Sequence, residues 1–470
     1  MTSTTLPGTS AAALAAATPP DRDRYVDLLR VASLGVVIAG HWLMAVPVPA
    51  ADGGIRVTNV LALVPALRPA TWLLQVMPVF FLVGGFAHAT ALASIRRRSG
   101  GYADFARSRT ARLLRPAAVF LAVWLALALG AALGGQDHGL VRVALRTAVQ
   151  PLWFLGVYLG LVALAPVMWR LHERFGARVP VVLLAVAAGV DVLRFAGHPR
   201  VAVLNLLVVW AGVHQLGFLY ADGTLRRGGR RLALLLAGGG LGALLLLTAV
   251  GPYPVSMVGV PGEEISNMSP PTVALAAHAV WLIGLVLLLR APANRLLGRA
   301  RVWRAVVAAN GLAMTAFLWH LSAAFIVLAA FGGRTGPAPG SAGWWATRPL
   351  WLGAAALVTA VLVLTFRRFD THRPTAIAPG SAARAAVGAA MCTLGVLGIS
   401  SVGFGGLLAG RSAMLLVVPV TAPLALGLLA VGAGLLRAAP PSRGRGWPQR
   451  LRRAPDAGSF SASPPSAQRR

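Results

Sequence analysis

The chain has 470 residues, of which 57% are hydrophobic and only 12% are charged. A soluble globular domain carries about twice that charged fraction, so the composition excludes an ordinary soluble fold. The formal net charge is +30, and all 43 basic residues are Arg. A nucleic-acid-binding protein would present a basic face with interleaved aromatic residues. Here the Arg residues stand in short clusters between long apolar runs, which indicates an integral membrane protein.

The two ends of the chain differ in composition from the rest. Residues 1–21 are rich in Ala, Thr, Ser and Pro, and no basic residue precedes their Ala-rich stretch, so they lack the basic start of a signal peptide. Residues 439–470 are rich in Arg, Pro and Ser. We expect both ends to be disordered, with the basic C-terminal tail held near an anionic inner leaflet.

Twelve apolar segments lie between these tails, and about 20 apolar residues suffice for a helix to cross a bilayer. The segments are 26–46, 71–94, 113–134, 151–169, 179–195, 201–221, 232–250, 272–289, 305–331, 346–366, 385–408 and 412–436. They predict an all-α, polytopic transmembrane bundle of about 12 helices. Ten helices form one domain over residues 22–370, and two more follow over residues 385–438.

The distribution of Arg residues predicts the orientation, because cytoplasmic loops carry the excess of basic residues. With the N-terminus inside, the inner segments hold 33 Arg residues and the outer segments hold nine. We therefore expect a multi-pass protein of the plasma membrane with both termini in the cytoplasm.

Ionisable residues within a bilayer are costly, so each one indicates a possible functional site. The first helix contains Arg30 and, eleven residues later, His41. Eleven residues are close to three turns and span about 16 Å, so both side chains lie near one face at different depths. Arg30 can meet an anion at the inner surface while His41 meets a reactive group deeper in the membrane. The alternative is that Arg30 anchors the helix and His41 makes an interhelical hydrogen bond.

A cluster of Arg residues enters the third helix from the cytoplasmic side. Arg109, Arg112 and Arg115 are three residues apart and share a helix face. Guanidinium groups match phosphate oxygens well, so this face can bind a phosphorylated donor. The positive-inside bias alone explains part of the cluster.

The predicted outer loop from Gly251 to Pro271 contains adjacent carboxylates and no Arg. Glu263, Glu264 and Asn267, with neighbouring hydroxyl groups, would suit a hydroxyl-rich acceptor. The alternative is an ordinary solvated loop.

Further histidines lie within the predicted helices. These are His88, His214, His278 and His320. No carboxylate or Cys accompanies them at ligand spacing, so we expect no metal site. The only cysteine, Cys392, lies in an apolar run that favours an inert, buried thiol and precludes an intrachain disulfide.

Six segments, in this order, resemble landmarks of acyltransferase family 3, whose members are membrane-bound, acyl-CoA-dependent enzymes that modify glycans, lipids and secondary metabolites. RYVDLLRVASLGVVIAGHW contains the family's spacing between Arg30 and His41. PVFFLVGG is similar to its second-helix segment, although Gly84 stands where Ser is common. RSRTARLLRP resembles its Arg-x-x-Arg motif. PLWFLGVYLGLVALAPVM, which includes Trp153, and SPPTVAL with TAFLWH resemble further landmarks. The likeness covers residues 22 to about 370.

The resemblance implies an acyltransferase of EC 2.3.1 type that moves an acetyl or other short acyl group from acyl-CoA to a hydroxyl of a glycan, lipid or secondary metabolite. Arg30, Arg109, Arg112 and Arg115 would bind the donor's phosphates. His41 would act as general base or take the acyl group briefly. Trp153 and His320 would support the reaction or contact the acceptor. No permanent cofactor is implied, because acyl-CoA acts as a co-substrate.

The alternative function is a small-molecule transporter, because twelve helices with both ends inside is also a common transporter plan. Transporters usually contain repeated halves with discontinuous helices at matching positions. The chain shows no such repeat, and the pair formed by Arg30 and His41 has no counterpart later in the sequence.

Overall fold

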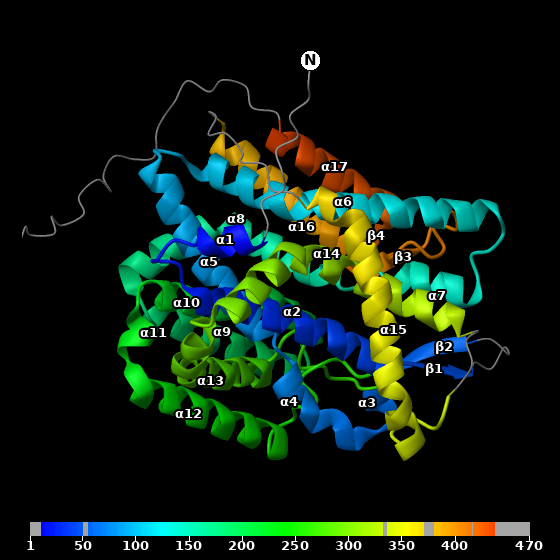
Figure 1. Cartoon of the computed structure of the whole chain (residues 1–470), viewed down its shortest axis with the longest axis horizontal. Coiled ribbons are helices and arrows are strands. Elements are labelled where there is room, and N and C mark those ends of the chain that lie inside the picture. The colour runs from blue at the N-terminus through cyan, green and yellow to red at the C-terminus, as the bar shows by residue number, and fades with distance from the viewer. Residues whose placement is uncertain (1–10, 50–54, 332–335, 371–379, 416, 438–470) are drawn as a thin grey trace, which may run out of the picture.

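The computed structural model describes residues 11–49, 55–331, 336–370, 380–415 and 417–437. The chain forms one helical bundle with two short β-hairpins at one end (Figure 1). Each of the twelve predicted segments has a helix in the structure, which confirms the all-α transmembrane class. The helices are α2 (Arg24–Met44), α5 (Met77–Arg97), α6 (Tyr102–Leu133), α8 (Leu152–Phe175), α9 (Arg178–Phe195), α10 (Asn205–Ala221), α12 (Gly229–Ala249), α13 (Val273–Leu297), α14 (Ala300–Ala330), α15 (Ala342–Phe366), α16 (Ala382–Val402) and α17 (Ala422–Arg437).

Ten helical spans in the described part of the chain are long and apolar enough to cross a membrane. The two other helices are α9 and α17. The first has 18 residues and includes the charged Arg178, Asp191 and Arg194. The second has only 16 residues, which is shorter than the roughly 20 that a bilayer requires.

Short elements connect these helices. The α-helical ones are α1 (Ala11–Ala16), α3 (Val60–Leu63), α4 (Thr71–Leu74), α7 (Gly139–Thr147) and α11 (Thr224–Arg227), and the 3₁₀ turns are η1 (Pro65–Ala70), η2 (Pro199–Leu204) and η3 (Arg367–Phe369). The strands are β1 (Ala45–Pro49), β2 (Ile55–Asn59), β3 (Ser412–Leu415) and β4 (Val418–Thr421). They form two separate antiparallel pairs, β1 with β2 and β3 with β4.

Two expectations from the sequence are wrong in part. The segment 412–436 does not start as a helix: the β3–β4 hairpin precedes α17, and its Val-rich sequence around Pro419 favours extended backbone. The expected N-terminal tail contains α1, because a run of Ala has high helix propensity. Thr18, which follows α1, is held by Trp303 of α14. Nε1 of Trp303 donates a hydrogen bond to Oγ1 of Thr18 at 3.0 Å. The expected C-terminal tail lies outside the described residues.

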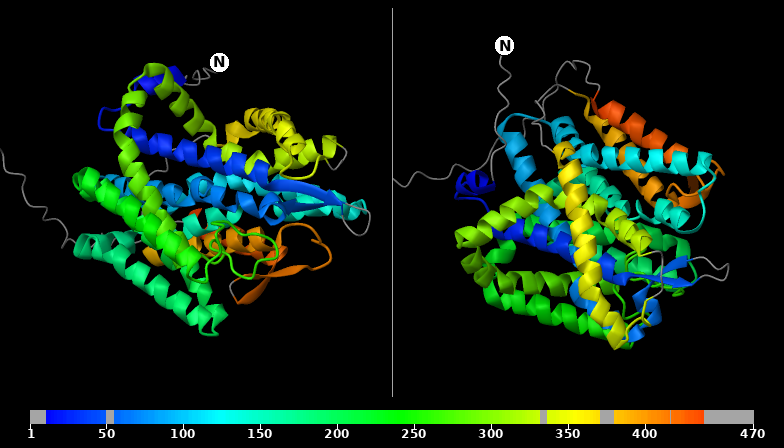
Figure 2. Two further views of the ribbon diagram at one scale, coloured as in Figure 1. Left: turned by 90° about the horizontal axis from the view of Figure 1, so that it is seen from below. Right: turned by 45° about the vertical axis from the view of Figure 1, so that its right-hand side comes forward.

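Both hairpins lie at the same end of the bundle, which we call the hairpin end (Figure 1). The helix ends and turns at the opposite end, which we call the arginine-rich end, carry Arg96–Arg98, Arg226–Arg227 and Arg230–Arg231. Helix α15 runs obliquely across α14 and contacts α2 (Figures 1 and 2). Asp370 follows the C-terminal end of α15 and η3 and lies against α14. Its Oδ2 accepts a hydrogen bond from Thr315 Oγ1 at 3.0 Å.

Glycine allows a close crossing between α5 and α10. Gly85 of α5 meets Gly217 of α10, and a Cβ atom on either residue would overlap the backbone of the other helix. Small residues at such crossings let membrane helices approach backbone to backbone. The crossing fixes α5 against α10 and brings His88 and His214 together, with Nδ1 of His88 2.9 Å from Nε2 of His214.

Candidate active site

His41 and His320 form a hydrogen-bonded pair. His41 lies in the last turn of α2 and His320 lies in α14, and 2.9 Å separates Nδ1 of His41 from Nε2 of His320. Their rings are 5.0 Å apart and nearly parallel, with an interplanar angle of 25°. The sequence singled out both residues separately, and the structure brings them together.

The neighbouring carbonyl of Phe317 assigns the tautomers of this pair. Nδ1 of His320 lies 2.5 Å from the Phe317 carbonyl oxygen, which can only accept. Nδ1 of His320 therefore carries the proton, and Nε2 of the neutral ring accepts. His41 must then donate from Nδ1, which leaves the lone pair on its Nε2. No hydrogen bond engages that atom in the described part of the chain.

Two tryptophans hold the pair in place. Trp42 follows His41 in α2 and donates from Nε1 to the His320 carbonyl oxygen at 2.9 Å. Trp351 of α15 donates from Nε1 to the Trp42 carbonyl oxygen at 2.8 Å. Helices α2, α14 and α15 are thus tied together around the histidines, and His320 is completely buried.

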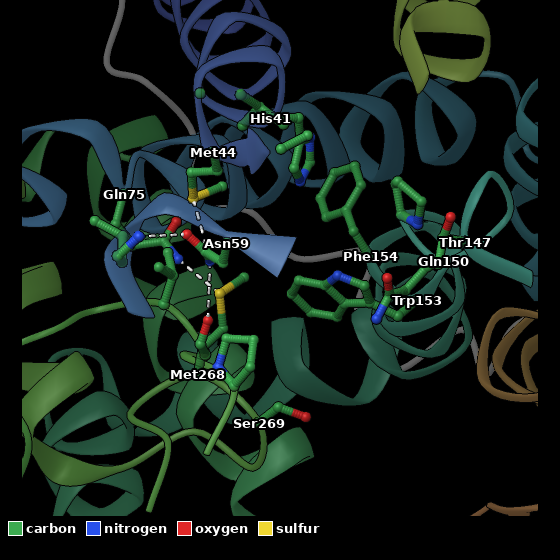
Figure 3. Close-up of a pocket in the computed structure, with 18 of the residues that line it drawn as sticks. His41, Met44, Asn59, Gln75, Thr147, Gln150, Trp153, Phe154, Met268 and Ser269 are labelled. Carbon is green, nitrogen blue, oxygen red and sulfur yellow. Dashed lines mark hydrogen bonds between the residues drawn. The ribbon is translucent and has the colours of Figure 1, made fainter. Parts of the chain in front are cut away.

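His41 opens onto a cavity of about 920 Å³ at the hairpin end. Figure 3 shows His41 at this cavity, with Trp153 and Phe154 beside it. The predicted supporting residue Trp153 therefore lines the same space as His41. The rest of the wall includes residues of the β1–β2 hairpin, the loop before α13, helices α7, α8, α14, α15 and α16, and strand β3.

Several polar side chains of the cavity wall form hydrogen bonds within the protein. Gln75 donates from Nε2 to the Met257 carbonyl oxygen at 3.2 Å and accepts from the Met77 amide at 3.2 Å. Asn59 accepts from the Leu61 amide at 2.9 Å (Figure 3). These contacts fix the loops that surround the cavity. Among the described residues that line the cavity, only Arg200 carries a formal charge while His41 is neutral.

A second centre lies toward the arginine-rich end, around the ring of Tyr158 in α8. The guanidinium groups of Arg30, Arg109 and Arg112 all interact electrostatically with Tyr158, and Arg112 also interacts with Arg30 and Asp370. None of the three arginines forms an ion pair among the described residues. Among the described residues, Asp370 acts on Arg112 only through its longer-range charge, and no carboxylate pairs directly with any of the three like charges, which is an arrangement that suits a polyanion. Arg112 and Arg115 are both exposed, but Arg115 is not one of the groups that act on Tyr158.

An aromatic layer separates the two centres. Phe154 and Phe317 line the cavity of His41, with ring centroids 5.6 Å apart. Phe154 also contacts Tyr158, at 6.2 Å between centroids. A donor anchored at the arginines would have to pass an acyl arm through this layer to reach His41.

The second histidine pair, His88 and His214, is completely buried and does not line the cavity. His88 packs against Tyr158 with ring centroids 5.0 Å apart. His278 also lies outside the lining, with Nε2 2.7 Å from the Trp72 carbonyl oxygen. In the described part of the chain, no three His, Cys, Asp or Glu side chains gather as metal ligands.

The predicted acceptor residues of the loop before α13 do not line the cavity. Glu263 forms an ion pair with Arg68 at 2.9 Å, and Glu264 is exposed. Asn267 is buried and donates to the carbonyl oxygens of Pro254 and Ser256 at 2.6 and 3.0 Å, so it braces the loop itself. Val258, Met268 and Ser269 are among the residues through which the loop reaches the cavity. Acceptor contact by Glu263, Glu264 or Asn267 stays a prediction.

Sequence reasoning missed two parts of the site. Phe317 is a backbone acceptor, and its only sequence signal is its position three residues before His320 on the same helix. Leu397, Ser400 and Ser401 of α16 line the cavity although they lie outside the resemblance. Nothing in their local pattern distinguishes them from residues that face lipid.

Comparison with known proteins agrees with this geometry. The model of a family described as an acyltransferase domain matches residues 23–367, which include both histidines of the pair and the three converging arginines. No curated protein and no solved structure matches the chain. The matched region covers well over half of the 470 residues. The chain is therefore a membrane protein that belongs to acyltransferase family 3.

Proposed function

We propose that the protein transfers an acyl group from an acyl-CoA-type thioester to a hydroxyl group of its acceptor, with His41 as the general base. The observation that carries this proposal is the pairing of His41 with His320. It orients Nε2 of a neutral imidazole beside a cavity that can hold an acceptor. Proton transfer by a positioned imidazole is typically worth about 100- to 10,000-fold in rate.

In the proposed reaction, Nε2 of His41 takes the proton of the acceptor hydroxyl as its oxygen attacks the thioester carbonyl carbon. A carbon–oxygen bond forms, and the carbon–sulfur bond then breaks. The departing thiolate takes the proton back from Nε2, so the products are an ester and a free thiol. During this cycle the imidazolium of His41 donates from Nδ1 to His320, which stabilises the charged intermediate.

The donor's phosphates would bind to Arg30, Arg109 and Arg112, because these guanidinium groups converge around Tyr158 and none of them forms an ion pair among the described residues. Helix α2 supports this assignment, because Arg30 and His41 are eleven residues apart, or about 16 Å along the helix axis. The long arm of a coenzyme A thioester spans such a distance. Arg115 is not among the groups that act on Tyr158, so we expect it to contribute less.

We infer that the arginine-rich end faces the cytoplasm, in accord with the positive-inside bias, and that the plasma membrane is the location. The hairpin end and the cavity of His41 would then face the outer side. In this arrangement a cytoplasmic donor acylates an acceptor that reaches the enzyme from the outer half of the membrane.

The test is acyl transfer by purified protein in lipid nanodiscs, measured for the parent and for His41→Ala. We expect His41→Ala to lose about 100-fold or more of turnover while it still binds coenzyme A. His198→Ala is the control, because His198 is an exposed histidine outside the cavity lining. Turnover of His41→Ala within a few-fold of the parent would refute the assignment.

A further inference from the structure

The cavity wall includes a segment outside the family-matched region. The match ends at residue 367, whereas Leu397, Ser400, Ser401, Met414 and Leu415 all line the cavity of His41. This wall, which we call the C-terminal wall, comes from α16 and β3. It lies outside the part of the chain that the family model matches.

The C-terminal wall is fixed to the matched domain. Helix α16 contacts α8, α6 and α17, and Figures 1 and 2 show α16 and α17 beside α6. At Gly156 of α8, a Cβ atom would lie 2.6 Å from Cγ of Leu397, so the two helices touch where α16 reaches the cavity. Gly395 and Gly432 allow equally close packing between α16 and α17.

The chemistry of the wall is apolar. Leu397, Met414 and Leu415 present hydrocarbon or thioether groups. The hydroxyls of Ser400 and Ser401 both donate to the Leu397 carbonyl oxygen, at 2.8 and 2.9 Å. Their protons are therefore occupied, and the wall offers a ligand few hydrogen bonds.

The remainder of the cavity has the same character. No Asp or Glu is among its lining residues in the described chain, and the nearby Glu263 is paired with Arg68. Four methionines contribute to the lining, and Met adapts to irregular apolar shapes. The volume of about 920 Å³ far exceeds that of a short acyl group and is typical of a pocket for a drug-sized molecule.

We propose that the cavity binds an amphipathic alcohol, whose hydroxyl end approaches His41 and whose apolar body contacts the C-terminal wall. This inference rests on the proposed function, and it names the class of acceptor as one with a substantial hydrocarbon part. A fully hydrophilic sugar would leave the apolar wall without a partner and would find no carboxylate in the lining.

The test compares two matched probes, octyl β-glucoside and methyl β-glucoside, which carry the same sugar hydroxyls and differ only in the alkyl chain. Ser401→Cys places a thiol on the C-terminal wall, where residue 401 is exposed to the cavity. The native Cys392 is completely buried, so the parent protein gives the background of labelling by a small methanethiosulfonate reagent. Leu408→Cys is the control, because Leu408 is 63% exposed and lies outside the cavity lining.

We expect octyl β-glucoside, below its micelle-forming concentration, to slow labelling of Ser401→Cys and not of Leu408→Cys. At about ten times the dissociation constant the rate should fall about tenfold. Equal protection by methyl β-glucoside should require a concentration at least about tenfold higher. Burial of only two of the extra methylene groups of octyl β-glucoside accounts for that ratio. Equal protection by both probes, or protection by neither, would overturn the inference.

Labelling requires no turnover, so the outcome is independent of the catalytic proposal. The same protection should appear in the double variant His41→Ala/Ser401→Cys. If the enzyme is active but octyl β-glucoside gives no selective protection, the proposed acceptor class is contradicted and the catalytic role of His41 is not. Selective protection together with an active His41→Ala variant supports the acceptor class and contradicts the catalytic role.

Discussion

Nδ1 of His41 lies 2.9 Å from Nε2 of His320, although 279 positions separate the two residues in the chain. The second histidine is fixed in turn by the carbonyl oxygen of Phe317. This order of donors and acceptors gives the two rings different tasks: His41 faces the cavity, and His320 orients it from behind. His320 is therefore a positioning residue in the proposed mechanism.

His320→Ala should lower kcat by about 10- to 150-fold, because a hydrogen bond to a charged group contributes about 1.5–3 kcal/mol. KM for the donor should change little, since none of the three arginines is among the groups that act on His320. His320→Gln offers an amide oxygen as acceptor and should recover part of the loss. Kinetics of both variants in nanodiscs test this expectation. Equal losses in kcat for the two variants, with an unchanged pH profile, would indicate a purely structural role.

Arg112→Ala should raise the donor KM by about 10- to 150-fold, the value expected when one charge-assisted contact is lost. Arg115→Ala should have a smaller effect, because Arg115 is not among the groups that act on Tyr158. The effect of Arg112→Ala should shrink at high salt, where charge interactions are screened. Coenzyme A titrations at two salt concentrations measure the loss of donor affinity and its salt dependence. An unchanged affinity in Arg112→Ala would exclude Arg112 from the donor site.

Much of the fold was predictable because the bilayer imposes long apolar helices whatever their neighbours are. All twelve apolar segments contain a helix, and the arginine clusters identified which helix ends lie together. Helical spacing also placed Arg30 and His41 at different depths of one helix. These conclusions depend on local composition and periodicity, which a single sequence contains.

The contacts between distant helices were not predictable in the same way. Nothing near His41 in the sequence identifies His320 as its partner, and nothing near Ser401 indicates that it lines a cavity. Residues such as Glu263 and Asn267 had the right chemistry for a binding site, but their side chains are engaged by Arg68 and by the loop backbone. Which polar group remains available depends on tertiary packing.

Gly84→Ser should disturb the donor site. The resemblance has Ser at this position, but here a Cβ atom on Gly84 would lie 2.6 Å from Cε2 of Tyr158. The ring around which the three arginines gather would have to move, at an overpacking cost of about 1–3 kcal/mol. We expect a lower thermal midpoint and a higher donor KM. Gly130→Ser in α6 is the control, because no heavy atom lies within 4 Å of its Cβ position, and it should match the parent.

Asp370→Asn should stabilise the protein at neutral pH. Burial raises the pKa of Asp370, against the opposing effects of the Thr315 hydrogen bond and Arg112. A carboxyl with a raised pKa binds more protons folded than unfolded, so stability falls as pH rises from the ordinary carboxyl pKa through the raised one. The side-chain amide of the Asp370→Asn variant cannot ionise, so the variant should not lose this stability as the pH rises. Thermal midpoints across that pH window measure the effect, and an unchanged pH dependence in Asp370→Asn would contradict it.

Gly156→Ala should separate the C-terminal wall from α8. Its new Cβ would lie 2.6 Å from Cγ and 2.7 Å from Cδ2 of Leu397, which is closer than real Cβ contacts allow. The expected results are a lower thermal midpoint and weaker protection of Ser401→Cys by octyl β-glucoside. Gly160→Ala, one turn along the same helix, is the control, because its Cβ would meet only Thr393 Cγ2 at 3.4 Å.

Leu397→Ala should partly rescue Gly156→Ala, because it removes the two atoms that cause the overlap. Alone, it should cost about 2–5 kcal/mol as a large-to-small change in a packed region. The double variant should therefore lose less unfolding free energy than the two single variants lose in sum. The shortfall is the interaction energy of the direct contact between α8 and α16. The Leu397 amide, 3.2 Å from the new Cβ, would remain and limit the rescue. Strict additivity of the two losses would mean that α16 does not pack on α8 at this point, and the wall would have to be assigned elsewhere.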